Sequence, residues 1–276
     1  MAGPSFGERY VSPAVPDYHV HSRFSDGRDD LEACVRRAIA LGLPELGFAD
    51  HLAPACLGED AYFGREAGWL DQYVAAVQRV GARHPELPVL LGVEAEFLPA
   101  AAEETQATLA AYSFDYVLCS VHYVDGFGFD EPESREAEGW RDVDRVFRTY
   151  YETLATAART GAFDVVAHFD LPKLWGHRPT ADLSELEDEV LGAVAAAGMA
   201  IEINTAGLDR HPVAEAYPAL DLLRRAHEAG IPVTFGSDAH RALEVGSSFS
   251  GALTLARRAG YDSSLRLSDR GRVRLS

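Results

Sequence analysis

The chain has 276 residues, 47% of them hydrophobic, which suffices for one large domain with a substantial buried core. Its formal net charge of −18 would repel a nucleic-acid backbone, and no cluster of Lys or Arg along the sequence offers a basic groove. A membrane-spanning helix needs about 18 consecutive apolar residues, and the sequence contains no such run. We therefore expect neither nucleic acid nor a membrane as a partner.

The first residues and the cysteines bear on the compartment. The first 16 residues lack the basic region and the apolar segment of a secretion signal, and we expect residues 1–14 to be a loose arm of a single domain that covers residues 1–276. Cys34, Cys56 and Cys119 follow no Cys-x-x-Cys spacing, and we expect them to be buried. Unpaired cysteines are typical of a reducing environment, which predicts a cytoplasmic location.

The chain alternates between short apolar strands and helices rich in Ala, Leu and Arg. The first strand covers residues 16–22, and the first helix covers residues 31–41, with Asp29 or Asp30 as its N-cap and Gly42 as its stop. Further strands are predicted at residues 46–49, 88–93, 116–121, 165–167, 199–204 and 231–235. Further helices are predicted at residues 66–83, 101–111, 140–159, 183–197, 220–229 and 251–259, before a short apolar piece and a polar tail.

Seven strand-then-helix units in succession predict a parallel sheet. No segment has the composition of a linker, so we expect an α/β fold in which the sheet closes, fully or nearly, into one barrel. An open, doubly wound sheet is the alternative, but no Gly-x-Gly-x-x-Gly motif follows the first strand. The acidic stretch at residues 125–139 is too polar for the core and is placed like a lid or rim loop.

Polar side chains end strand after strand, beginning with His19 and His21. Residues two apart on a strand point the same way, so both imidazoles face one point in space. The candidate metal ligands are His19, His21, Asp26, His51, Glu94, His122, His168, Asp238 and His240. In a barrel the carboxyl ends of the strands meet at one mouth, where active sites are built. Imidazole and carboxylate together suit Zn, Mn or Fe, and nine ligands would serve two or three divalent ions, with Glu94 able to bridge.

The candidates also have alternative, structural explanations. A single buried histidine is more often a hydrogen-bonded core group than a ligand, but six of the ten histidines fall at strand ends. Asp26 alone would be an ordinary residue of a Ser-Asp-Gly turn. Of the other histidines, His84 and His227 belong to helices, whereas His177 and His211 lie in loops, where His177 could touch a substrate.

The proposed ligands favour one reaction class. Paired metal ions lower the pKa of a bridging water and clamp the oxygens of a transferring phosphoryl group, so phosphate ester hydrolysis is the natural reaction. No serine, cysteine or aspartate stands out as a covalent nucleophile. Ser22, Ser120 and Ser237 lie beside ligands, and we expect them to support those ligands by hydrogen bonds.

Seven pieces of the sequence together carry a family resemblance. They are His-Val-His-Ser (19–22), Ala-Asp-His-Leu-Ala-Pro (49–54), Gly-Val-Glu-Ala-Glu-Phe (92–97), Ser-Val-His-Tyr (120–123), His168, Ile-Asn-Thr-Ala-Gly-Leu (203–208) and Phe-Gly-Ser-Asp-Ala-His (235–240). Their order along the chain resembles that of the polymerase and histidinol phosphatase (PHP) superfamily, and the longer motifs resemble those of its histidinol-phosphate phosphatases. The resemblance implies a distorted seven-stranded β/α barrel of the PHP type with a trinuclear metal centre.

The resemblance also implies how the ligands are shared among the ions. One ion would take His19, His21, Glu94 and Asp238, a second would share Glu94 and take His122 and His168, and the third would take His51, His240 and a ligand from the loop after His21. Some phosphatases of this group have a histidine in that loop, whereas this chain has Asp26, as other PHP phosphoesterases do.

The implied reaction is the hydrolysis of L-histidinol phosphate to L-histidinol and phosphate in histidine biosynthesis. A metal-bound hydroxide would attack phosphorus in line, with Glu94 holding the ions and Asp238 or His240 managing protons. The expected substrate-binding residues are Lys173 and Arg210 for the phosphate, with Arg178 as third choice, Glu96 for the ammonium group, and His177 at the rim. For each of the three cations, an exposed loop position without a ligand is the alternative.

Two other functions compete with this one. The Asp26 turn also occurs in PHP phosphoesterases that act on nucleotides or oligonucleotide ends, although the net charge of −18 argues against such substrates. The third hypothesis is a metal-stabilised barrel that only binds a partner. It is the weakest, because all nine candidate ligands are present.

Overall fold

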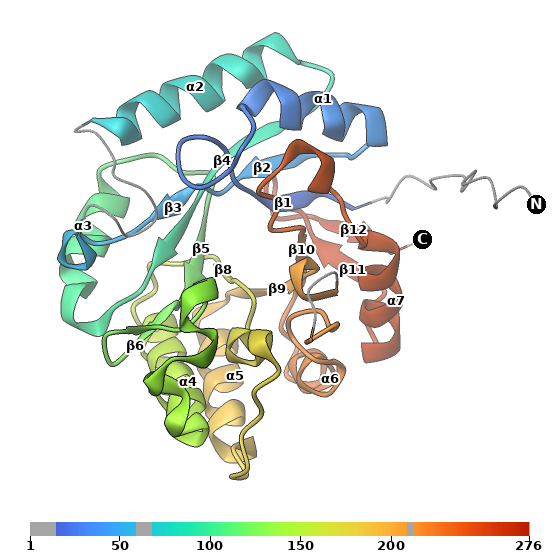
Figure 1. Ribbon diagram of the computed structural model, residues 1–276. Coiled ribbons are helices and arrows are strands. Elements are labelled where there is room, and N and C mark those ends of the chain that lie inside the picture. Colours follow the sequence, from blue (N-terminus) through green and yellow to red (C-terminus); the bar gives the residue numbers. More distant parts are fainter. Residues whose placement is uncertain (1–14, 59–67, 209–211, 276) are drawn as a thin grey trace, which may run out of the picture.

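The computed structural model describes residues 15–58, 68–208 and 212–275. Its centre is a nearly closed barrel of parallel strands, in the spatial order β1-β2-β4-β5-β8-β9-β10 (Figure 1). These strands are β1 (Asp17–Val20), β2 (Leu46–Phe48), β4 (Val89–Glu96), β5 (Tyr116–Ser120), β8 (Val165–Val166), β9 (Ala200–Asn204) and β10 (Val233–Gly236). The short β3 (His51–Leu52) follows β2 and pairs with the later part of β4. The predicted seven-stranded α/β barrel is therefore confirmed.

The first and last strands of the sheet approach each other where the barrel closes. The backbone N–H of His21 donates to the carbonyl of Ala239 at 2.9 Å, and the N–H of Ala239 donates to the carbonyl of His19 at 3.2 Å. The buried carboxylate of Asp17 accepts a further bond from the N–H of Ser237 at 2.9 Å. These bonds bring the first and the last candidate ligands in the sequence, His19 and His240, to the same mouth of the barrel.

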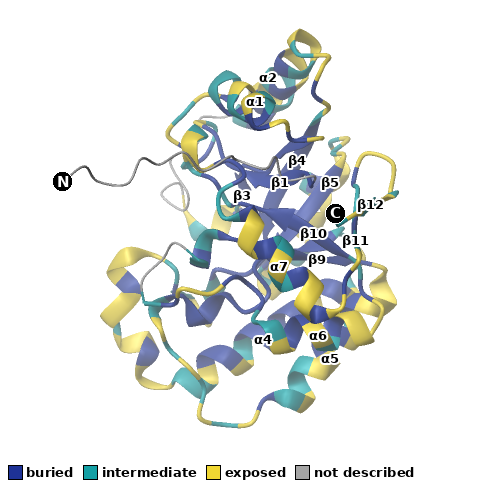
Figure 2. Cartoon of the chain, turned by 90° about the vertical axis from the view of Figure 1, so that its right-hand side faces the viewer, coloured by how far each residue is buried: buried dark blue, intermediate teal, exposed yellow. Residues whose placement is uncertain are grey.

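Seven helices among the described residues surround the strands (Figure 1). They are α1 (Leu31–Leu41), α2 (Trp69–Arg83), α3 (Ala102–Ala110), α4 (Val143–Arg159), α5 (Ser184–Ala197), α6 (Leu220–Glu228) and α7 (Phe249–Ala259). The bounds of α1 match the prediction because Asp30 caps its N-terminus and Gly42 ends it in the left-handed conformation, at φ 68°. Figure 2 shows buried residues on the strands and exposed residues on the outer faces of the helices. None of the described helices is long and apolar enough to cross a membrane.

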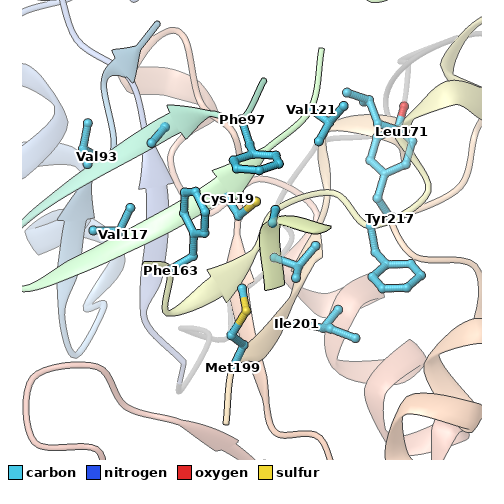
Figure 3. Close-up of a cluster of buried hydrophobic side chains, with 14 of the residues drawn as sticks. Val93, Phe97, Val117, Cys119, Val121, Phe163, Leu171, Met199, Ile201 and Tyr217 are labelled. Atoms are coloured by element: carbon cyan, nitrogen blue, oxygen red, sulfur yellow. The ribbon is translucent and has the colours of Figure 1, made fainter. Parts of the chain in front are cut away.

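Alternation along the strands separates the helix-packing core from the barrel interior. In β4, Leu91 and Val93 face outward into the large hydrophobic cluster, as do Val117 and Cys119 of β5 (Figure 3). The intervening residues face inward. They run from Leu90, in a smaller cluster that closes the bottom of the barrel, to polar groups at its mouth. The period of two therefore fixes which side chains of each strand can reach the site.

Three expectations about irregular segments need correction. The lid or rim loop expected at residues 125–139 has regular structure: it contains β7 (Phe127–Gly128), which pairs with the preceding β6 (Tyr123–Val124), the 3₁₀ helix η3 (Pro132–Glu136) and the start of a second, η4 (Glu138–Arg141). The expected polar tail forms a second hairpin, β11 (Ser263–Leu265) with β12 (Arg272–Arg274). Cys56, which we expected to be buried, is exposed in a short 3₁₀ helix. The arm expected at residues 1–14 lies outside the described residues.

Candidate metal centre

The end of β1 supplies the first ligands. His19 and His21 are almost completely buried and both point into the barrel mouth. The Nε2 atom of His21 lies 3.2 Å from Oδ1 of Asp238 and 3.6 Å from Oε2 of Glu94. The Nε2 atom of His19 lies 3.3 Å from the same oxygen of Glu94 and 3.8 Å from Oδ1 of Asp238. Two imidazoles and two carboxylates thus converge from β1, β4 and the end of β10.

Glu94 lies at the centre of the cluster, with only 1% of its side chain exposed. Besides the two β1 histidines, three more imidazoles approach its oxygens. Nδ1 of His51 lies at 2.9 Å, Nε2 of His168 at 2.9 Å and Nε2 of His122 at 3.6 Å. One carboxylate therefore faces five histidines that come from four different strands or strand ends, an arrangement that suits a bridging ligand.

A third group of ligands forms around Asp26, beside the first. Oδ2 of Asp26 lies 2.7 Å from Nε2 of His240 and 3.6 Å from Nε2 of His51. The rings of His21 and His240 are stacked, with centroids 4.4 Å apart. The structure thus brings all nine candidate ligands together, with Asp238 beside His21 and His168 beside Glu94. His21 and His51 each lie between two groups.

The loop that carries Asp26 is held in place by hydrogen bonds to Asp50. The carboxylate of Asp50 accepts hydrogen bonds from the N–H and hydroxyl of Ser22, at 2.8 and 2.7 Å, and from the hydroxyl of Ser25 at 2.6 Å. At Gly27 a Cβ would come within 2.6 Å of the backbone of His21, so the tight turn needs glycine. Asp50, which sequence reasoning placed at a strand end without a role, therefore holds this loop in place.

Several atoms at the centre have no hydrogen-bond partner within the described residues. They include Nε2 of His19, Nε2 of His21 and Oε2 of Glu94, all of them buried. Buried polar groups in native proteins nearly always have partners, because leaving one unpaired costs about 1–3 kcal/mol. Nitrogen and oxygen atoms that converge without hydrogen-bond partners are the donor set of a transition-metal or zinc site, so the residues present fit divalent cations.

The electrostatics of the cluster agree with this reading. Burial alone would raise the pKa of Glu94, but His51 and His19 hold that pKa well below its usual range. Burial alone would lower the pKa of His19, but the carboxylates of Glu202, Glu94 and Asp238 raise it well above its usual value. The pKa of Asp238 is likewise held well below its usual range by His19, His21 and His240, so Glu94 and Asp238 favour positive charge beside them. Because a histidine must be neutral to bind a metal, cations would replace protons at the ligating nitrogens.

Two further carboxylates hold ligand histidines from behind. Oε1 of Glu202 lies 2.7 Å from Nδ1 of His19, and its other oxygen accepts the backbone N–H of His168 at 3.0 Å. A Cβ at Gly236 would overlap Oε1 of Glu202, so glycine there keeps the carboxylate in place. Oε2 of Glu96 lies 2.7 Å from Nδ1 of His122. Such outer partners orient metal-binding histidines and fix their tautomers.

Sequence reasoning missed Glu202, although a signal for it exists. Glu202 lies between two buried isoleucines in β9, and an acid inside an apolar strand must face the barrel interior by alternation. Two ligands also adopt unusual backbone conformations directly after or close to their strands, with φ of 24° at His168 and 55° at Asp238. Positive φ at residues other than glycine is uncommon and concentrates at functional sites.

A cavity of about 760 Å³ opens beside the ligands. Outside the nine candidate ligands, its lining contains Arg28, Asp130, Glu131, Pro132, Leu171 and Trp175. Arg28 is the one basic side chain of this lining among the described residues. Sequence reasoning singled out none of these six residues, because each lies in a loop or 3₁₀ segment whose position depends on the whole barrel.

The site geometry can be set beside known proteins. A family model described as PHP domain matches residues 17–206, and one described as PHP-associated matches residues 222–250. A relative from Deinococcus radiodurans named "Probable histidinol-phosphatase" is 42% identical over 224 residues, which is 81% of this chain and 85% of that protein. The chain belongs to the PHP family. The family resemblance drawn from the sequence is thereby confirmed.

Other PHP proteins extend the match along the chain. The histidinol-phosphatase of Lactococcus lactis subsp. lactis is 27% identical over 263 residues, 89% of this chain and 91% of that protein. A crystal structure of histidinol phosphate phosphatase from Lactococcus lactis, complexed with Zn, L-histidinol and phosphate, matches with a TM-score of 0.74 at 24% identity. That match covers 92% of this chain and 97% of the other, and it supports the PHP barrel fold.

Two of the three expected phosphate-binding cations, Lys173 and Arg178, have partners away from the cavity. Nζ of Lys173 is buried, donates to the carbonyl of Ala216 at 2.8 Å and lies 2.8 Å from Oδ2 of Asp170. The guanidinium of Arg178 donates to the carbonyl of His177 at 2.9 Å and to Glu215 at 3.2 Å. Neither side chain is part of the cavity lining. Arg210, the other expected phosphate ligand, lies outside the described residues.

The two remaining expected substrate contacts also have other partners. Glu96 is 2% exposed, both of its carboxylate oxygens contact His122, and it does not belong to the cavity lining. The ring of His177 stacks on Trp140, with centroids 4.1 Å apart, and does not belong to the cavity lining. The reason for both corrections is the same. The alternation of side chains along a strand predicts whether a residue faces the barrel interior, but it does not predict which neighbouring side chain forms a hydrogen bond or a ring contact with it.

Proposed function

We propose that this PHP protein is a histidinol-phosphatase that hydrolyses L-histidinol phosphate to L-histidinol and phosphate in histidine biosynthesis. The observation that carries the proposal is one cavity beside six histidines and three carboxylates, of which Nε2 of His19, Nε2 of His21 and Oε2 of Glu94 are buried with no hydrogen-bond partner within the described residues. The names of its relatives support the substrate, since a 42% identical protein is named as a probable histidinol-phosphatase.

Two or three divalent ions, Zn, Mn or Fe, would be held by the three groups of ligands. The groups are His19, His21, Glu94 and Asp238; Glu94, His122 and His168; and Asp26, His51 and His240. When bound, such ions activate water as a nucleophile and neutralise charge on the phosphoryl oxygens. Glu94, which all the central histidines face, would hold two ions at a fixed separation.

Proton transfer is assigned to the exposed edge of the cluster. His240 is 28% exposed and Asp238 is 12% exposed, whereas the side chains of Glu94, His19 and His21 are at most 1% exposed. Protons must be exchanged with solvent in every turnover, so a group at the edge can do this while the buried groups cannot. We assign this role to the pair Asp238 and His240, with Nδ1 of His240 held 2.9 Å from the carbonyl of Asp238.

The phosphate end of the substrate needs a cation besides the metals, and Arg28 replaces Lys173 in that role. The backbone N–H of Arg28 donates to the carbonyl of His240 at 2.7 Å, which fixes the arginine beside the third ligand group. Its planar guanidinium can bind two phosphate oxygens at once. By contrast, Lys173 would have to leave Asp170 to reach a substrate.

The test is steady-state phosphate release from L-histidinol phosphate and from a panel that includes p-nitrophenyl phosphate and short oligonucleotides, with Zn, Mn or Fe added. We expect a clear preference for L-histidinol phosphate, a KM raised about tenfold by Arg28→Met, and no release of mononucleotides. An equal rate on all simple phosphate esters would contradict the proposal, and release of mononucleotides would favour a nucleotide-directed PHP phosphoesterase.

A further inference from the structure

One wall of the cavity carries negative charge that the nine candidate ligands do not account for. Asp130 and Glu131 line it, and with Arg28 they are the charged groups of the lining outside the ligand set. We propose that Asp130 and Glu131 bind the cationic alcohol part of the substrate, so that the enzyme selects phosphate esters whose alcohol carries an ammonium group. This inference rests on the proposed function and names the residues that give it specificity.

The carboxylate of Asp130 is turned toward the ligand cluster. Its Oδ2 atom lies 4.0 Å from Nε2 of His122, and its Oδ1 atom is buried without a hydrogen-bond partner in the described part of the chain. Only 21% of the side chain is exposed, so water reaches it poorly. An ammonium group has three N–H donors and no acceptor, which is the complement of an ionised carboxylate with an unpaired oxygen.

Asp130 is held rigidly because its neighbour Phe129 is anchored. The hairpin turn before it has positive φ at both Asp125 (52°) and Gly126 (78°), the geometry of a tight two-residue turn. The N–H of Phe129 then donates to the carbonyl of His122 at 3.1 Å, and Nε1 of Trp175 donates to the carbonyl of Phe129 at 2.8 Å. A group fixed before binding loses little conformational entropy when the ligand arrives.

The surroundings of the acid pair favour an organic cation over a free metal ion. Pro132, Leu171 and Trp175 line the same cavity, so an ion pair with Asp130 forms against apolar surface where its Coulomb energy is larger than in water. The face of Trp175 can also receive a planar ring or a cation. Arg28, which carries the opposite charge, lies beside His240 in the same lining. The cavity therefore has a cationic end for phosphate and an anionic end for the alcohol.

The experiment compares matched substrates across four variants. The substrates are L-histidinol phosphate and 3-(imidazol-4-yl)propyl phosphate, which differ only by the ammonium group. The variants are Asp130→Asn, Glu131→Gln, the double variant, and the control Glu133→Gln, which changes an exposed acid of η3, the 3₁₀ helix that begins directly after Glu131, and is not part of the lining. The wild-type protein should prefer the amino substrate by about tenfold or more in kcat/KM, because a hydrogen bond between charged groups is stronger than one between neutral groups.

The double variant should reduce that preference to about threefold or less through KM, with the rate on the propyl ester and the metal content unchanged. Glu133→Gln should leave the preference intact. Parallel loss of activity on both substrates, or an unchanged preference in the double variant, would overturn the inference. Loss of a metal ion in Asp130→Asn would also overturn it, since Asp130 would then be a ligand.

A second substrate pair separates this inference from the proposed function. If L-histidinol phosphate proves no better than p-nitrophenyl phosphate, the proposed function fails, and 2-aminoethyl phosphate against ethyl phosphate then decides the inference. A preference for the aminoethyl ester that disappears in the double variant would support a cation-binding wall. Equal rates on the two esters in the wild-type protein would overturn it.

Discussion

Two carboxylates of the barrel are equally buried, and their surroundings differ in kind. Asp17 at the start of β1 accepts bonds from the N–H groups of Ser237 and Gly246, each at 2.9 Å, and from the hydroxyl of Ser237 at 2.6 Å. Glu94 near the end of β4 faces imidazole nitrogens, and one of its oxygens has no hydrogen-bond partner within the described residues. Both side chains are 0–1% exposed, so burial alone does not distinguish a structural acid from a candidate metal ligand.

The direction of the pKa shift does distinguish them. Burial raises the pKa of Asp17 to about 6, because neutral donors such as Ser237 and Gly246 do not fully compensate a buried negative charge. The histidines around Glu94 hold its pKa well below the usual range despite the same burial. Asp170 is an intermediate case, since the chain itself supplies the cation, Lys173, at 2.8 Å. At Glu94 the positive charge has to come from protons or bound metal ions.

The largest effect should follow from Glu94→Gln, which removes the negative charge at the centre of the histidine cluster. Glutamine keeps the shape but loses the charge and one ligating oxygen, so we expect kcat to fall by at least about 100-fold and the metal content to drop by at least one ion per chain. Elemental analysis and phosphate release measure both. A variant that keeps its full metal content and most of its activity would contradict the bridging role.

Lys173→Met tests the intermediate case. Removing the ammonium group leaves Asp170 buried without its cation, so we expect a loss of about 3 kcal/mol in the free energy of unfolding, measured by urea denaturation. Because Lys173 makes no cavity contact in the structure, KM for the substrate should change less than in Arg28→Met. The opposite pattern, an intact stability with a strongly raised KM, would restore Lys173 as a phosphate ligand.

Glu202→Gln tests the support of a ligand histidine. The carboxylate of Glu202 faces Nδ1 of His19 and the backbone N–H of His168, and an uncharged amide with one oxygen cannot replace both of these hydrogen bonds. Metal affinity should therefore fall by about 10- to 100-fold while the fold persists. Gly236→Ala should give a similar effect, because its Cβ displaces the same carboxylate. Metal titration against a competing chelator measures both. Unchanged affinity in both variants would mean that Glu202 does not orient His19.

The smallest effect is expected from Asp17→Asn, the structural counterpart of the first substitution. One amide oxygen must replace two carboxylate oxygens, and its NH₂ group then faces an N–H donor, which should cost about 1–2 kcal/mol of stability. Metal content and kcat of the folded variant should stay close to the wild-type values. Loss of metal comparable to that of Glu94→Gln would show that the distinction between the two acids is wrong.

The sequence sufficed for the barrel because strand ends and alternation are local signals. His19 and His21 are two apart, and Glu94 ends an apolar strand, so their common direction follows from the period of a β-strand. The helix at residues 31–41 was predicted with the right bounds since Asp30 and Gly42 mark its ends. The same local signals placed nine candidate ligands at one mouth, and the structure brings the nine side chains together there.

The hydrogen-bond partners of the side chains at the mouth of the barrel could not be predicted in the same way. Glu96 shares its strand face with Glu94, yet His122 occupies its carboxylate, and this depends on the register between β4 and β5. Lys173 follows His168 closely in sequence, but Asp170 and a carbonyl from residue 216 take its ammonium group. Asp130 lies in a polar stretch that we expected to be a lid or rim loop, and its position depends on the burial and the backbone hydrogen bonds of Phe129 beside it.

Metal removal and reconstitution test the central claim most directly. The protein is stripped with a chelator, titrated with Zn, Mn or Fe, and followed by elemental analysis and by phosphate release from L-histidinol phosphate. We expect the stripped protein to be inactive, and activity to return as two to three ions bind per chain. Full activity in the stripped protein, or saturation at less than one ion per chain, would contradict a catalytic metal cluster.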